Sequence, residues 1–134
     1  RTLVTALGAP TLLAACADSG TDAAEDRVEE AAEASAAAAG PAQVALGLSE
    51  AELIDADLVG ANNVELGDVT SLVRGAGGEV EGLLVEIEDS NPDRFVQVPL
   101  TGLSVVTRGN DRDLSTTMTR EQLVALPDAP LPAR

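Results

Sequence analysis

The chain has 134 residues, and its 23 acidic residues outnumber eight basic ones, which gives a formal net charge of -15. This charge argues against binding to DNA, RNA or a bare anionic bilayer, because each of these requires a cationic face on the protein. The sequence also lacks His and Lys, which excludes the commonest general base and the Schiff-base amine. Its single Cys cannot form an internal disulfide or a thiolate zinc site.

Residues 1–15 are mostly apolar and lead into the motif Leu13-Ala14-Ala15-Cys16. About fourteen apolar residues are too few to cross a hydrocarbon core, which needs about twenty, but they suit the apolar region of a secretory signal. We therefore expect residues 1–15 to be a signal peptide whose charged start is truncated before Arg1.

This motif resembles the lipobox of bacterial lipoproteins, in which small residues flank the cleavage point and Cys becomes the new N-terminus. The resemblance implies that Cys16 is acylated, and two or three acyl chains anchor a protein stably to a membrane. It also implies a location in the bacterial cell envelope, facing the periplasm. Ala17, where an Asp would favour the inner membrane, favours the outer membrane. The alternative is an ordinary secretory signal in which Cys16 is an incidental thiol.

Residues 16–47 follow as a segment rich in Ala and Glu. Its helix propensity is high, but it has no large apolar face, since Val28 is the only bulky apolar side chain between Ala17 and Gly40. Isolated helices of this length are marginal in water. We therefore expect a flexible, disordered, partly helical acidic tether that stops at Gly40-Pro41. A docked amphipathic helix is the alternative.

Residues 48–128 have the pattern of a small all-β domain with short flanking helices. Two capping boxes, Ser49-Glu50-Ala51-Glu52 and Thr119-Arg120-Glu121-Gln122, each predict the start of a short helix. Apolar and β-branched runs between turn signals predict six strands, over residues 58–61, 66–74, 80–88, 95–98, 103–107 and 114–118.

The strand at 80–88 has the clearest alternation. Every second residue from Leu83 to Ile87 is apolar, whereas Glu86 and Glu88 lie on the other face, so we expect one buried and one mostly solvated face. Six short strands at this spacing suit a small closed or nearly closed barrel, which also removes exposed edges. We expect residues 129–134 to be a loose tail.

The stretch from Leu58 to Pro127 resembles a PRC-barrel domain. Its most specific part is Thr119–Pro127, which is similar to the helix that closes small members of that family. Further similarities are Leu58-Val59-Gly60, Leu66-Gly67-Asp68-Val69 with Leu72-Val73, Gly82, and Val98-Pro99-Leu100. The resemblance implies a six-stranded barrel that docks other proteins and is not a catalyst. The sequence departs from the family at its first hairpin, which is shortened to Asn62-Asn63-Val64-Glu65.

Other polar segments have structural interpretations that we favour over chemical ones. The loop Asp89-Ser90-Asn91-Pro92-Asp93 has oxygen ligands at the first, third and fifth positions of a calcium loop, but Arg94 and Leu100 stand where that loop needs Gly and Glu. Asn110-Asp111-Arg112-Asp113 is interpreted as a turn in the same way. Gly75-Ala76-Gly77-Gly78 joins two strands, which indicates a hairpin connection and not a phosphate-binding loop. We predict no metal site and no cofactor.

These observations favour a non-enzymatic protein, anchored in the membrane by acyl chains on Cys16, whose domain docks an envelope protein or contributes to envelope organisation. Ser and Thr have no His or Lys to activate them, so a hydrolytic triad is not expected. One alternative is a lipoprotein that binds a cation or small ligand through acidic loops, using Asp89 and Asp93. Another is a hydrolase with a pair of carboxylates, which needs a concave pocket holding two acids.

Overall fold

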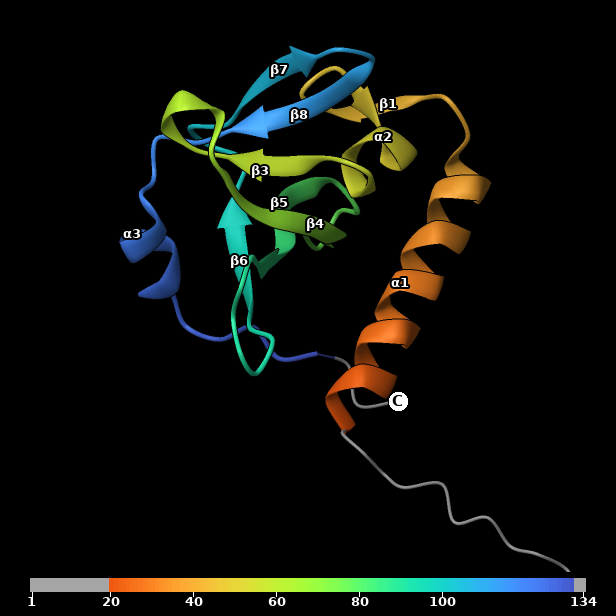
Figure 1. Cartoon of the computed structure of the whole chain (residues 1–134). Helices are drawn as coiled ribbons and strands as arrows, with labels where there is room; N and C mark the ends of the chain where they lie inside the picture. Colours follow the sequence, from red (N-terminus) through yellow and green to blue (C-terminus); the bar gives the residue numbers. More distant parts are fainter. Residues whose placement is uncertain (1–19, 132–134) are drawn as a thin grey trace, which may run out of the picture.

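The computed structural model describes residues 20–131, which form a six-stranded mixed sheet, a two-stranded sheet and helices (Figure 1). The strands of the larger sheet are β3 (Asp57–Val59), β4 (Glu65–Arg74), β5 (Val80–Ile87), β6 (Phe95–Pro99), β7 (Ser104–Arg108) and β8 (Asp111–Ser115). The smaller sheet consists of β1 (Gln43–Ala45) and β2 (Leu48–Ser49). The helices are α1 (Gly20–Ala39), α2 (Glu50–Ile54), the 3-10 turn η1 (Ala61–Asn63) and α3 (Arg120–Val124).

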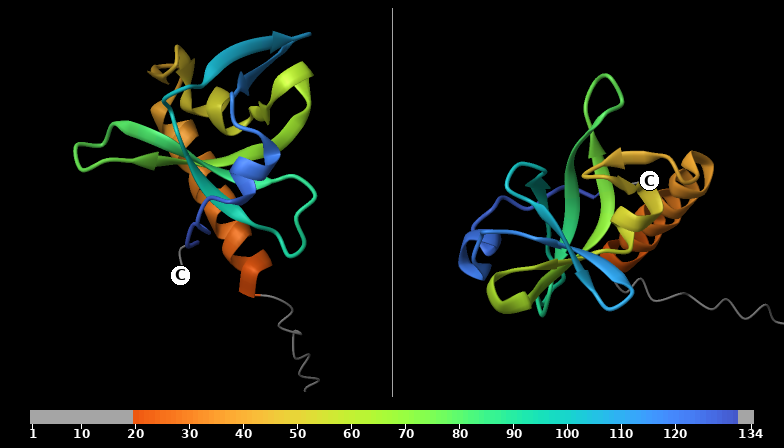
Figure 2. Two further views of the ribbon diagram at one scale, coloured as in Figure 1. Left: turned by 90° about the vertical axis from the view of Figure 1, so that its left-hand side faces the viewer. Right: turned by 90° about the horizontal axis from the view of Figure 1, so that it is seen from above.

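The larger sheet has the strand order β6-β5-β4-β3-β8-β7. All neighbours are antiparallel except β3 and β8, which run parallel and pair Leu58 with Leu114. The hairpin of β4 and β5 forms the longest ladder and projects from the rest of the sheet (Figure 2). The prediction of six strands is confirmed, although the last begins at Asp111 and not at Leu114.

The sheet is not closed as a barrel, so of the closed or nearly closed barrel that was expected, the closed form is wrong. Strands β6 and β7 are the two ends of the strand order and do not pair with each other. β6 ends at Pro99, which has no N–H to extend the ladder. The free edge of β6 is instead met by the C-terminal segment, where the Ala129 N–H donates to the Phe95 carbonyl oxygen at 2.7 Å. The seam between β6 and β7 therefore stays open.

One apolar core lies against the inner face of the curled sheet, and α2 and α3 each contribute a side chain to it. Leu53 of α2 and Leu123 of α3 are both 0% exposed. Each helix begins at a capping box: Ser49 and Thr119 accept the N–H of the residue three positions on, and that residue's side chain accepts the cap N–H. Both predicted capping boxes are confirmed. Each one sets the residue at which its helix begins, and with that start one Leu of the helix is directed into the core.

The segment predicted to be a flexible tether is helical from Gly20 to Ala39 and packs on the outer face of the sheet (Figures 1 and 2). Its buried side chains recur at every fourth position and are Ala24, Val28, Ala32 and Ala36. Small side chains let the helix backbone approach the sheet closely, so packing is possible without a bulky apolar face. Over these residues the structure differs from the expected tether and corresponds to the docked-helix alternative.

The outer face of β5 is partly apolar and is covered. Leu84 forms a small cluster with Val28 of α1 and Phe95 of β6, and Ala129 and Leu131 pack against the same cluster. The C-terminal segment is therefore docked as far as residue 131, which differs from the loose tail expected for residues 129–134. Residues 132–134 lie outside the described part of the chain.

Two tight turns depend on residues with positive φ. Asn62 and Asn63, predicted as turn residues, have φ values of 60° and 58°, in the left-handed region that Asn tolerates. The small hairpin β1–β2 was not predicted; its two central residues, Leu46 and Gly47, have φ values of 53° and 74°. Positive φ at both central residues is typical of β-hairpins with two-residue loops. Leu rarely adopts this conformation, so the sequence gives little signal for the turn.

Candidate functional site

The predicted anchoring residues, Leu13, Ala14, Ala15 and Cys16, lie outside residues 20–131, so their roles stay predictions. Within the described residues, carboxylates gather in two places. One is a pocket beside α1, and the other is a row across the outer face of the sheet that reaches α1 at one end.

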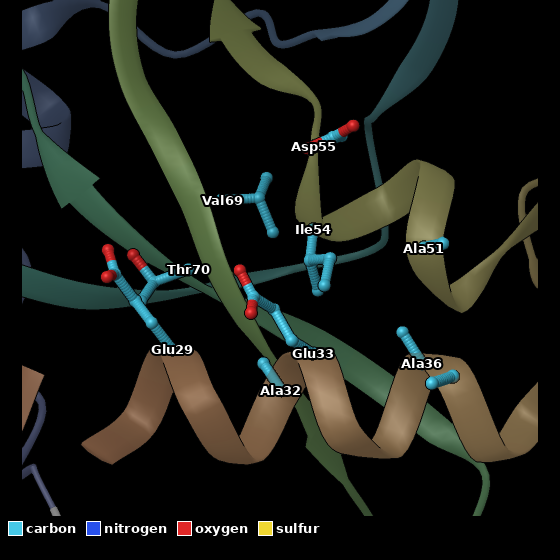
Figure 3. A pocket seen from close by; sticks show the side chains of 10 residues that line it. Glu29, Ala32, Glu33, Ala36, Ala51, Ile54, Asp55, Val69 and Thr70 are labelled. Atoms are coloured by element: carbon cyan, nitrogen blue, oxygen red, sulfur yellow. The ribbon is translucent and has the colours of Figure 1, made fainter. Parts of the chain in front are cut away.

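A pocket of about 430 Å³ lies between α1, α2 and β4 (Figure 3). The alanines of α1 make part of its lining apolar, and three carboxylates make another part acidic. The lining residues are Glu29, Ala32, Glu33, Ala36, Ala37, Ala51, Ile54, Asp55, Val69 and Thr70. In Figure 3, the side chains of Glu29 and Glu33 extend from α1 on the side that faces β4. Ala32, Ala36 and Ala37 of α1 therefore form the apolar part of the pocket wall.

The chemistry of this pocket is limited. Its lining contains carboxylates and a Thr hydroxyl but no His, Lys, Arg or Cys, so it offers no nucleophile paired with a usual base. It meets one condition of the carboxylate-hydrolase alternative, because Glu29, Glu33 and Asp55 all line it. It has none of the aromatic side chains that bind sugar rings, and its charge would repel an anion.

Three carboxylates lie next to one another across neighbouring strands. The register pairs Asp57 of β3 with Asp68 of β4, and Asp68 with Glu86 of β5. Directly paired residues share a face of a sheet, so the three side chains lie on one side. This is the side that α1 covers, because Leu84, two residues before Glu86, contacts Val28. Like charges directly opposite each other destabilise a sheet unless a proton or a cation reduces the repulsion.

Burial and neighbouring acids raise the pKa of two members of this row. Burial raises the pKa of Asp68 to about 7, and the hydrogen bond and charge of Asp57 add to the effect. Burial likewise raises the pKa of Glu86 to about 7, together with the charge and hydrogen bond of Glu25 and the charges of Asp93 and Asp68. Both groups therefore change protonation near neutral pH.

The acids form two groups in which the carboxylate oxygens all lie within 4.8 Å of one another: Asp57, Glu65 and Asp68 on the sheet, and Glu25, Glu86 and Asp93 between α1 and the sheet. In the first group, burial and the charges of Asp57 and Glu88 also raise the pKa of Glu65. With one oxygen from each, three carboxylates supply fewer ligand atoms than the six to eight oxygens that Ca²⁺ takes. The raised pKa values favour shared protons, and we assign neither group as a metal site.

Arg108 of β7 connects this row to a buried acid. Its Nε donates to Oδ2 of Asp113 at 2.5 Å, and one of its terminal nitrogens lies 3.4 Å from Oδ2 of Asp57. The hydrogen bond that Arg108 donates to Asp113 raises the pKa of the guanidinium. Asp113 is 2% exposed, and its Oδ1 accepts the Asp57 N–H at 3.1 Å. These contacts explain why β8 begins within the polar segment that the sequence indicated to be a turn.

The loop of residues 89–93 is a turn, as predicted. The Ser90 hydroxyl donates to the Ile87 carbonyl oxygen and accepts the Arg94 N–H, which closes the turn without a cation. Asp93 is grouped with Glu25 of α1, whereas Asp89 belongs to neither acidic group. The one acid of this loop that belongs to an acidic group, Asp93, thus lies next to α1 and β5.

Sequence reasoning placed Glu86 on a solvated face and missed its contact with α1. The sequence did contain a signal, because the apolar residue Leu84 lies on the same face as Glu86. Its presence indicates that another segment packs on this face, and in the structure Val28 of α1 does so. Predicted hairpin residues Gly75–Gly78 do connect β4 to β5, where the Gly78 N–H donates to the Gly75 carbonyl oxygen.

No helix within residues 20–131 is both long and apolar enough to span a membrane. The chain matched no protein-family model, and no curated protein matched it. Its function is therefore inferred from its sequence motif and from the geometry of its described residues.

Proposed function

We propose that this chain is a lipid-anchored protein of the bacterial cell envelope whose domain docks a protein partner on the periplasmic side of the membrane. The observation that carries the anchor is the motif Leu13-Ala14-Ala15-Cys16 at the end of an apolar run, followed at once by acidic, small-residue sequence. A net charge of -15 gives the protein no electrostatic attraction to anionic lipid, so acyl chains on Cys16 would hold it there.

The docking role is supported by the domain. Its sequence resembles the PRC-barrel family from Leu58 to Pro127, and the resemblance implies a docking module. The sequence holds no His or Lys and one Cys, which leaves few means of common enzymatic catalysis. Three large apolar side chains are exposed on the domain: Val64 at 56%, Val105 at 37% and Val124 at 39%. They are the natural starting points for a protein contact.

Replacing Cys16 with Ser should abolish acylation of the chain in the bacterial cell. Serine keeps the size and polarity of the side chain but lacks the thiol to which diacylglycerol is attached. Metabolic labelling with an alkyne fatty acid, followed by membrane fractionation, measures both acylation and location. Undiminished labelling of the Cys16→Ser chain, or its unchanged recovery with membranes, would contradict the anchor.

Photo-crosslinking should capture a discrete envelope protein from the domain and not from α1. Benzoylphenylalanine would replace Val64, Val105 or Val124 in turn, and Glu30, an exposed residue of α1, serves as the matched control. A chain lacking residues 48–128 but keeping Cys16 controls for capture by the anchor alone. Docking is refuted if Glu30 yields the same adducts as the domain positions, or if the deletion co-purifies with the same proteins as the complete chain.

A further inference from the structure

The two edges of the six-stranded sheet differ in how they are protected. The edge strand β6 ends at Pro99, and its Phe95 carbonyl oxygen already accepts the Ala129 N–H. The other edge strand, β7, pairs with β8 alone and lies at the outside of the sheet (Figures 1 and 2). β7 contains no Pro and no Lys, and its ladder with β8 has no bulge. It therefore lacks the usual features that prevent an edge strand from pairing with another strand.

The turn between β7 and β8 shows which backbone groups of β7 are free. Its two-residue loop begins at Gly109, whose φ is 63°. The residues that flank such a loop, here Arg108 and Asp111, form a hydrogen-bonded pair, and hydrogen-bonded pairs alternate with non-hydrogen-bonded ones along the ladder. The N–H and C=O groups of Val105 and Thr107 therefore point away from β8. Within residues 20–131 no other strand pairs with them.

One side chain of this edge is exposed although it lies on the core side of the sheet. Val105 is the register partner of Leu114, and directly paired residues share a face. Leu114 is 0% exposed and belongs to the core, whereas Val105 is 37% exposed. The difference arises because no strand follows β7 at the open seam. A further strand added to β7 would cover Val105.

The charge of the chain favours this edge for contact with a second copy. The 23 acidic residues of each copy would repel those of the other over much of the surface. Residues 94–110, which include β7, contain no acid. The one charged side chain of β7, Arg108, is paired with Asp113 and Asp57 of its own chain. Two β7 strands placed side by side therefore bring no acid of one strand against an acid of the other.

We propose that two copies of this chain associate through their β7 strands, which pair antiparallel about a two-fold axis at Val106. Val105 of each copy then lies opposite Thr107 of the other, so the outward N–H and C=O groups of both residues are hydrogen-bonded in both copies. The pairing covers Val105 and joins the two six-stranded sheets into one continuous sheet. It satisfies the edge of both copies at once, because the same strand supplies both sides of the contact.

This pairing goes beyond the proposed function and does not depend on it. It requires neither acylation of Cys16 nor docking of an envelope protein. Val64 and Val124 lie outside β7, so crosslinking at these two positions tests docking separately from the dimer.

Sedimentation equilibrium of the full chain tests the pairing. We expect a reversible monomer–dimer equilibrium with a dissociation constant on the order of 100 µM, because two short strands bury less area than a stable dimer needs. Thr107→Pro removes an N–H that points away from β8, so it should keep the β7–β8 ladder and weaken the dimer about tenfold. The apolar residues 1–15 are identical in every variant, so association through them would not change.

A lysine at Val105 tests the same edge if the proline variant misfolds. Val105→Lys places a charge where the second copy must pack, as natural edge strands do, and should also weaken the dimer about tenfold. Val64→Lys adds the same charge at an exposed position outside β7 and should leave the dissociation constant within about twofold of the original. It also controls for the smaller net charge of both lysine variants.

Disulfide formation tests the register. In the proposed dimer the two copies of Val106 form a non-hydrogen-bonded pair, whose Cα atoms lie about 4.5 Å apart, within the range that a disulfide spans. With Cys16 replaced by Ser, Val106→Cys should form a covalent dimer under mild oxidation about tenfold faster than Val64→Cys.

The proposal is overturned if the chain is entirely monomeric at about 1 mM. It is also overturned if Thr107→Pro and Val105→Lys both keep the original dissociation constant, or if Val64→Lys weakens the dimer as much as Val105→Lys does. Equal rates of covalent dimer formation by Val106→Cys and Val64→Cys would contradict pairing at β7.

Discussion

Replacing Gly67 with alanine is expected to destabilise the domain by about 3 kcal/mol. A Cβ at this position would lie 2.4 Å from the Glu86 carbonyl oxygen and 2.8 Å from a methyl group of Val85. Both neighbours belong to β5, so the longest ladder of the sheet must shift to admit one methyl group. Gly67 also pairs with Leu58 of β3, and the shift would therefore reach the centre of the sheet. Urea unfolding followed by far-ultraviolet circular dichroism measures the loss.

Gly77→Ala is the matched control for this prediction. A Cβ there would meet only the carboxylate end of Glu79, an exposed side chain that can rotate away. We expect a change of no more than about 0.5 kcal/mol. If Gly67→Ala proves as stable as Gly77→Ala, the close packing of β4 on β5 at Gly67 is refuted.

Replacing Arg74 with methionine should destabilise the domain by about 2 kcal/mol. Arg74, near the end of β4, pairs with the carboxylate of Glu50 in α2, whose side chain is only 4% exposed. Methionine keeps most of the packing of the arginine side chain but leaves this buried carboxylate without its cation. The value lies below that for a fully buried pair because Arg74 itself is 37% exposed and solvent screens the interaction.

Two comparisons separate burial from charge in this prediction. Arg112→Met breaks the exposed ion pair with Glu52, also in α2, and should cost no more than about 0.5 kcal/mol. Glu50→Leu combined with Arg74→Met removes both charges and should be more stable than Arg74→Met alone. Equal losses in Arg74→Met and Arg112→Met, measured by urea unfolding, would show that the buried position of Glu50 has no energetic consequence.

The strands and capping boxes could be predicted because their signals are local. The extent of β5 and the turn residues around Asn62 depend on neighbours in the sequence, and the structure has them where expected. The expected solvated face of β5 is wrong, because Leu84 on that face is buried against Val28 and Phe95. Closure of the sheet could not be predicted in this way. It depends on whether β6 meets β7 or the C-terminal segment, and the hydrogen bond from Ala129 to Phe95 joins residues far apart in the chain.

The docking of α1 was missed because alanine gives almost no signal for burial. Ala24, Ala32 and Ala36 have the same helix propensity whether they face water or a sheet, and Val28 alone does not define an apolar face. The acidic groups were missed for a related reason. Each carboxylate looked solvated in its own segment, and only the register of β3, β4 and β5 places Asp57, Asp68 and Glu86 in one row.

The parallel pairing of β3 with β8 also has a consequence for the order in which the chain folds. The strands β4, β5 and β6 are joined by short connections, as are β7 and β8, so each set can form from local contacts. β3 joins the two sets, and its Asp57 N–H meets Asp113, 56 residues further along the chain. The pairing of β3 with β8 joins only two residue pairs and closes a long stretch of chain, so we expect it to form late in folding. The domain is therefore two local hairpin units that become one structure only when β3 and β8 come together.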